Sequence, residues 1–214
     1  LLGWQWLTLH FTPVGVLGSA LAIFVAFRNN AAYSRWWEAR TLWGNIVNNS
    51  RILARQLIAN AGNAAAAGKA SAETVGAFQQ EMLYRQIAFA HALRLQLRQQ
   101  ESWQQVYAFL PAAEAEALVR VPNKPNQLLL TQAVRIKDAM RQEILGPFDN
   151  ISLEPAIGAF NNWQGACERI KFTPLPRQYD FFTRIFVGVF AFLLPPALLG
   201  LLAATPGIAW LSIP

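Results

Sequence analysis

The side chains that carry most enzyme chemistry are few and scattered in this chain. It has two histidines, His10 and His91, and one cysteine, Cys167, which argues against a thiolate metal site and excludes a disulfide within the chain. Glu114 and Glu116 are two residues apart and do not share a helix face. There is no glycine-rich phosphate loop and no Ser–His–Asp set. We therefore predict no enzyme, metal or cofactor, with a haem- or quinone-linked membrane enzyme that uses His10 as an axial ligand kept as an alternative.

Three side chains near the N-terminus suit a different kind of chemistry, the passage of ions. Ser19, Ile23 and Phe27 are spaced i, i+4 and i+8 and therefore lie on one stripe of a helix. Repeated around a symmetry axis, such a stripe forms a narrow hydrophobic constriction, which can gate ion flow by dewetting. The alternative is that the stripe packs against a neighbouring helix or against lipid.

Polar residues follow this stripe without a break. Arg28, Asn29 and Asn30 stand at the end of the apolar stretch, where an arginine and two amides can line an aqueous mouth. An inward-facing Arg28 would favour anions. The alternative for Arg28 is that it snorkels at the flank of a membrane helix.

A dense aromatic and ionic group comes next along the same segment. Arg35, Trp36, Trp37 and Glu38 are consecutive. Tryptophan is enriched where a protein leaves the lipid for water. We predict a structural junction here between a membrane part and a water-facing body, with arginine–glutamate pairs.

Charge is distributed unevenly along the 214 residues. Every Lys, Arg, Asp and Glu lies within 28–184, although 54% of all residues are apolar. This predicts membrane segments at 1–27, with a neck helix at 14–27, and at 185–214, on either side of a helical body at 28–184. The basic flanks place the body in the cytoplasm. The net charge of +6 comes without a nucleic-acid motif, so nucleic acid is not an expected partner.

Hydrophobic periodicity predicts an all-α protein without strands. A Gly/Ala-rich run at 60–71 reads as an exposed linker, and Ser71 or Thr74 as the cap of the helix that follows. On that helix Arg85 is expected on the polar side. The predicted helices are 14–27 continuing through 28–61, then 71–98, 101–109, 112–119, 126–145, 152–171 and 178–204. The missing initiator Met and an apolar start of a further span at 208–214 indicate a piece of a longer protein, and no signal peptide is recognised.

Three stretches resemble the bestrophin family, specifically its bacterial branch. The first runs from Ile23-Phe24 through FRNNAAYSRWWEARTLWG to Gly44. The second is Ala166-Cys167-Glu168-Arg169-Ile170 followed by Thr173-Pro174-Leu175-Pro176 and an aromatic helix. The third is the Leu193-Leu194-Pro195 membrane segment. They occur in the family's order and cover most of the chain.

The resemblance implies a homopentameric ion channel of the plasma (inner) membrane, multi-pass, with one pore, a transmembrane neck and a cytosolic vestibule. The family's three neck positions fall on Ser19, which departs from the bulky apolar pattern, and on Ile23 and Phe27. A second, cytosolic restriction falls sixteen positions before Cys167, on Ile151. Its implied partners are the lipid bilayer and small monovalent ions. Chloride or cation selectivity and calcium regulation stay open, and a membrane scaffold without a pore is the other alternative.

Overall fold

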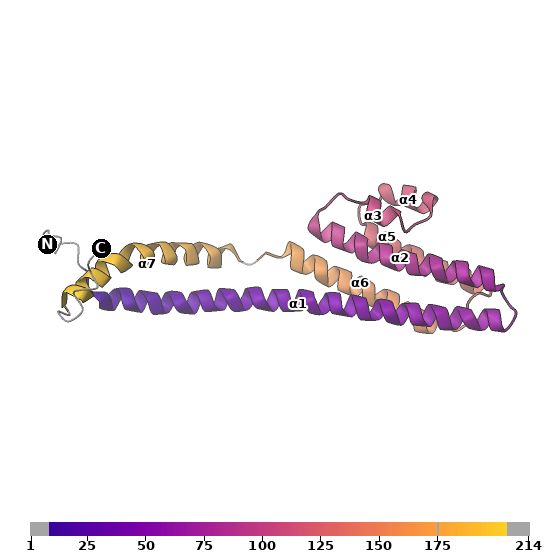
Figure 1. The fold of residues 1–214 in the computed structure, drawn as a ribbon, viewed down its shortest axis with the longest axis horizontal. Coiled ribbons are helices and arrows are strands. Elements are labelled where there is room, and N and C mark those ends of the chain that lie inside the picture. The colour runs from indigo at the N-terminus through magenta and orange to yellow at the C-terminus, as the bar shows by residue number, and fades with distance from the viewer. Residues whose placement is uncertain (1–8, 175, 205–214) are drawn as a thin grey trace. The chain divides into compact units, whose positions relative to one another are not determined.

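The structure is a computed structural model that describes residues 9–174 and 176–204, and within these residues all regular structure is α-helical. The prediction of an all-α protein is thereby confirmed (Figure 1). In chain order the helices are α1 (Phe11–Ala66), α2 (Ala72–Arg98), α3 (Gln104–Tyr107), α4 (Ala112–Val119), α5 (Lys124–Arg141), α6 (Asn150–Phe172) and α7 (Arg177–Ala204).

The chain divides into two compact units. The first joins residues 1–37 to 174–214, and the second comprises residues 38–173. Two helical stretches, one in Phe11–Ala66 and one in Asn150–Leu201, are long and apolar enough to cross a membrane by length and composition. The first unit therefore contains the apolar parts of α1 and α7, and the second contains the body.

Helix α1 runs for 56 residues. Pro13 lies in its first turn, where its missing N–H breaks no intrahelical bond. The predicted linker at 60–71 is wrong in its first half, because α1 continues to Ala66 and Ala61 and Ala64 are buried. Alanine is the strongest helix former and its small side chain permits close packing. The true turn begins at Ala67 and includes Gly68, whose φ is +66°.

Helix α2 begins where the sequence indicated. The Ser71 Oγ accepts a hydrogen bond from the Thr74 backbone N–H at 3.1 Å, which satisfies one of the unpaired donors of the first turn. Helix α2 packs against α5 and α6. Together with α1 these helices enclose a core that includes Leu53, Phe78, Phe89 and Phe160.

Helix α5 ends at Arg141, four residues before the predicted end at 145. Glu143 adopts the left-handed conformation with φ +58°, and the Ile144 N–H donates to the Ala139 carbonyl oxygen at 2.9 Å. These contacts close the helix in the manner usual for a C-terminal glycine. The chain then turns before α6 begins at Asn150.

Replacing Glu143 with glycine is expected to stabilise the protein by about 1 kcal/mol, because an L-residue is disfavoured in the left-handed region. The melting temperature of the purified protein in detergent should rise by about 2–4 °C. Glu143→Ala is the control, since it removes the carboxylate and keeps the Cβ. Equal effects of the two substitutions would show that backbone strain is not the cause.

In the first unit α7 packs along α1. A Cβ on Gly18 would lie 2.8 Å from the Phe190 ring, so the absence of a side chain allows this close approach. The Phe24 and Phe186 rings stack with centroids 5.5 Å apart. Further along, the Leu9 N–H donates to the Pro196 carbonyl oxygen at 3.3 Å. Glycine and aromatic residues thus fix one side of α1 against α7.

Candidate pore-lining site

The predicted neck residues Ile23 and Phe27 lie away from the Gly18 face of α1, against which Phe190 of α7 packs, although Phe27 also borders a hollow with Pro176 and Tyr179. Phe27 comes nine residues after Gly18, and at about 100° per residue this places the two on opposite sides of the helix. Ile23 and Phe27 are 58% and 64% exposed in the single chain. Val16, on the same stripe, is also exposed. One subunit therefore leaves a continuous apolar stripe uncovered.

Ser19 is the one polar member of the predicted stripe. Its Oγ donates to the Gly15 carbonyl oxygen of the preceding turn at 3.1 Å. The hydroxyl is thereby satisfied within the helix, and the polar character that the side chain offers to its surroundings is reduced. A serine at this position is compatible with an apolar stripe.

Arg28 is held by a residue that the sequence did not reveal as its partner. Its guanidinium lies 2.8 Å from a carboxylate oxygen of Asp180, in the first turn of α7. The same carboxylate also contacts Arg184 one turn later. Asn29 and Asn30 are exposed on α1. The structure therefore directs Arg28 toward α7, whereas the two amides are open to the surroundings of the single chain.

A hollow of about 570 Å³ lies beside Arg28. Its lining combines residues of α1 with residues at the start of α7: Phe24, Phe27, Arg28, Ala31, Pro176 and Tyr179. Aromatic and aliphatic side chains dominate, and Arg28 is the one charged residue among them. Phe27, the last predicted neck residue, and Arg28, the first predicted mouth residue, therefore line the same hollow.

The predicted junction contains an aromatic group on α1. The Trp36 ring lies with its centroid 5.7 Å from that of Tyr33 and 6.1 Å from that of Trp37. Arg35 is half-buried on the same helix. The tryptophan side chains are largely exposed in the single chain, as expected for rings at a lipid–water boundary.

Glu38 begins the second unit and forms an ion pair with Arg169 of α6 at 2.7 Å. Both side chains are exposed, so the pair contributes little stability. It does, however, join the first two stretches that carry the resemblance to bestrophins. Cys167 is buried close by, and burial raises the pKa of its thiol to about 11, with the Glu168 and Glu38 carboxylates adding to the effect. The thiol is therefore protonated at neutral pH.

Glu168 of the same stretch is surrounded by amides. The Gln96 and Gln164 side-chain N–H groups donate to its carboxylate at 3.1 and 2.9 Å. Gln164 also donates to Asn123 at 3.0 Å, and Asn123 caps the first turn of α5. This cluster ties the end of α6 to α2 and α5.

Ile151, the predicted cytosolic restriction, lies in the first turn of α6. Its side chain is 68% exposed in the single chain. Phe148, three residues earlier, is also exposed. The position leaves Ile151 available to meet other copies of the chain.

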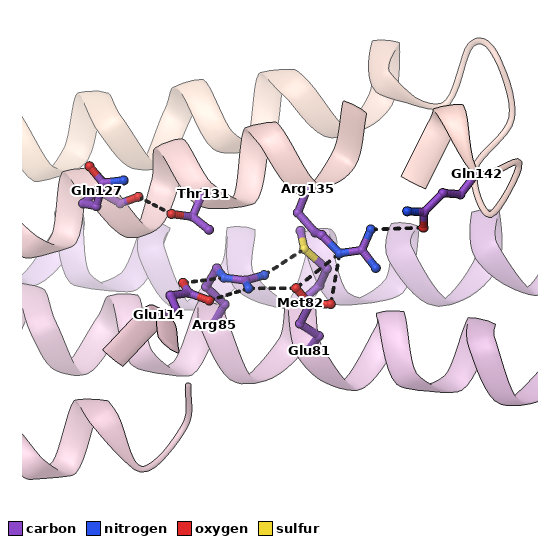
Figure 2. A network of polar contacts seen from close by, with 8 residues as sticks. All are labelled: Glu81, Met82, Arg85, Glu114, Gln127, Thr131, Arg135 and Gln142. Carbon is purple, nitrogen blue, oxygen red and sulfur yellow. Dashed lines mark hydrogen bonds and ion pairs between the residues drawn. The ribbon is translucent and has the colours of Figure 1, made fainter. Parts of the chain in front are cut away.

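The largest difference from the sequence reading concerns Arg85, which was predicted on a polar face. Its side chain is 3% exposed. Figure 2 shows its guanidinium between Glu114 of α4, contacted at 2.8 and 2.6 Å, and Glu81, contacted at 2.8 Å. Arg135 of α5 approaches Glu81 at 3.0 Å. The prediction for Arg85 is wrong because its partner Glu114 lies 29 residues away and no local pattern connects the two.

The charges of this network hold each other in their ionised forms. Burial raises the pKa of Glu81, but hydrogen bonds from Arg85 and Arg135 and their charges outweigh it and leave the pKa below 4.5. Burial lowers the pKa of Arg85, but the hydrogen bonds that Arg85 donates to Glu114 and Glu81, together with the charges of these carboxylates, outweigh it, so the net shift is upward. The network therefore clamps α2, α4 and α5 together as long as the carboxylates are charged.

Comparison with known proteins identifies the class to which this helical membrane protein belongs. The family model described as bacterial/fungal bestrophin matches residues 1–212. The chain belongs to this family, which confirms the resemblance found in its sequence, and membership makes it a membrane protein.

Several proteins of known structure or curated name are similar to this chain. A voltage-dependent anion channel-forming protein of Ralstonia nicotianae is 34% identical over 188 residues, which are 87% of this chain and 58% of the relative. A protein of the same description from Escherichia coli is 32% identical over 87% of this chain and 57% of its own length. A solved bestrophin homologue from Klebsiella pneumoniae superposes with a TM-score of 0.79 at 30% identity, over 90% of this chain and 66% of the homologue. The chain thus spans less than two thirds of each of these proteins.

Proposed function

We propose that the protein is a homopentameric channel that conducts small monovalent anions such as chloride through a hydrophobic neck. The observation that carries the proposal is the exposure of the Ile23 and Phe27 side chains, which lie on α1 away from the Gly18 face that packs against Phe190 of α7. A stripe that α7 leaves uncovered is available to meet its copies around an axis. Closed cyclic assembly is the usual symmetry of such oligomers.

Ion passage then depends on water in the neck. Rings of isoleucine and phenylalanine side chains offer an ion no replacement for its hydration shell. A narrow neck therefore stays dry and closed, and it conducts when it widens enough to hold water. The surrounding helices α2, α5 and α6 of the body form the walls of a cytosolic vestibule in this proposal. Ile151 contributes a second ring there, and its exposed side chain in the first turn of α6 supports this role.

The choice of anions has two supports. The curated relatives are named anion channel-forming proteins. Next to the neck, Arg28 and Arg184 share the single carboxylate of Asp180, so these three side chains carry a net positive charge. A positive mouth raises the local concentration of anions. The relatives are named channel-forming proteins and not enzymes, which favours a channel over the haem- or quinone-linked enzyme.

Planar-bilayer recording of the purified protein tests the proposal. With about a tenfold KCl gradient, we expect discrete currents that reverse near the chloride equilibrium potential. Currents that reverse near the potassium potential would refute the anion preference and leave the channel itself intact. Complete absence of current, together with monomeric or dimeric particles in detergent, would instead support the membrane scaffold without a pore.

A further inference from the structure

Two arginines and one aspartate meet next to the last neck residue. Arg28 follows Phe27 on α1, and its guanidinium is 2.8 Å from Asp180 on α7. The Arg28 and Asp180 side chains are 44% and 36% exposed. Arg184 contacts the other carboxylate oxygen of Asp180. The Asp180 carboxylate on α7 therefore fixes the position of Arg28, the first positively charged side chain after the neck, and reduces its effective charge.

This ion pair contributes little to folding but has a large effect on the local charge. An exposed pair contributes between zero and about 1 kcal/mol to folding. The field of a guanidinium that contacts a carboxylate is nevertheless largely cancelled for an ion passing several ångströms away. Removing Asp180 would leave two uncompensated positive charges per subunit where there is now a net charge of one.

The hollow beside Arg28 leaves room for a second position of the Arg28 side chain. The hollow of about 570 Å³ is lined by Phe27 as well as Arg28. An Arg28 side chain released from Asp180 can therefore swing within it toward Phe27, that is, toward the proposed neck. Held by Asp180, the same side chain stays against α7.

We propose that Asp180 is a specificity-determining residue, which holds Arg28 against α7 and thereby limits the preference of the inner mouth for anions. This inference rests on the proposed channel function. Its physical content is that selectivity at this mouth follows the charge of a three-residue group, Arg28, Asp180 and Arg184. The charge of Arg28 counts in full once Asp180 is gone.

The test measures reversal potentials in planar bilayers under a KCl gradient. For Asp180→Asn we expect the anion-to-cation permeability ratio to rise about three- to tenfold, because the charge of Arg28 is then no longer compensated and its side chain is no longer held against α7. Asp180→Glu keeps the charge and should behave like the wild type. Arg28→Gln should shift the reversal potential in the opposite direction, toward the potassium equilibrium potential. In the Arg28→Gln background, Asp180→Asn should have a clearly smaller effect.

The controls separate this inference from the proposed function. Asp138→Asn removes another aspartate that contacts an arginine, Arg141, in the second unit, and should leave the reversal potential unchanged. If currents through the Asp180→Asn channel reverse at the wild-type potential, the inference about Asp180 is overturned and the proposed channel function is not. An equal shift with and without Arg28 would also overturn it, because Asp180 would then act through its own charge. If Asp180→Asn does not assemble, an Arg28→Gln channel with the wild-type reversal potential overturns the inference equally. Absence of all current in the wild type would refute the channel function itself.

Discussion

Phe27→Ala is expected to raise the single-channel conductance or the open probability on the order of several-fold. The small alanine side chains of the five subunits would leave room for water in the neck. Phe27 is largely exposed in the single chain and lies on α1 opposite Gly18, where Phe190 of α7 packs. Ile23→Ala should act in the same direction, one turn along the stripe. Planar-bilayer recordings of both variants beside the wild type provide the measurement.

Phe24→Ala is the matched control for this prediction. Phe24 is also a phenylalanine on α1, three residues before Phe27, but its ring stacks on Phe186 of α7 at 5.5 Å. Its loss should lower the melting temperature through lost aromatic packing and change conductance little. If Phe24→Ala raised the conductance as much as Phe27→Ala, or if neither neck variant had any effect, the assignment of the neck would be wrong.

Arg85→Met should cause the largest loss of stability among the changes considered, about 3–5 kcal/mol, because it leaves two partly buried carboxylates without their shared cation. Glu114 contacts Arg85 through two hydrogen bonds, and Glu81 contacts it through one. The melting temperature in detergent should fall by roughly 10 °C or more. Arg98→Met on the same helix is the control, since Arg98 is exposed and its replacement should cost less than about 0.5 kcal/mol.

A double variant tests the cause of this loss. Glu114→Gln in the Arg85→Met background removes the carboxylate that Arg85 no longer pairs, whereas Glu81 keeps Arg135, and should restore part of the stability. If the double variant were less stable than Arg85→Met, the loss would arise from packing of the arginine side chain rather than from its charge.

The same network predicts sensitivity to acid. The pKa of Glu81 is lower in the folded protein than its ordinary value of 4.5. A carboxylate with a depressed pKa stabilises the folded state above its unfolded pKa, and this contribution is lost as the pH falls through the folded value. The melting temperature should therefore decline below about pH 4.5, and the decline should be smaller for Glu81→Gln. An identical pH dependence in both proteins would show that Glu81 is not responsible.

Local signals in the sequence identified most helices and their order. The Ser71 cap and the apolar spacing on α2 and α6 act over a few residues and can be recognised without a structure. The exception at 60–66 has a physical reason as well. An alanine-rich run is at once low in complexity and high in helix propensity, and burial of Ala61 decided between the two.

The candidate site could be predicted only where spacing along one helix defines it. Ile23 and Phe27 share a face because of their separation in the chain. Arg28 meets Asp180, 152 residues later, through packing between two helices. Nothing local to either residue distinguishes that pairing from others, although Asp180 and Arg184 are spaced i, i+4 and could have been recognised as an ion pair.

A density map of the purified protein in a lipid nanodisc is the most direct test of how its subunits come together. We expect fivefold rotational symmetry, with the side chains of residues 23 and 27 from every subunit directed at the axis. Side chains directed at the surrounding lipid, or particles without that symmetry, would contradict the account.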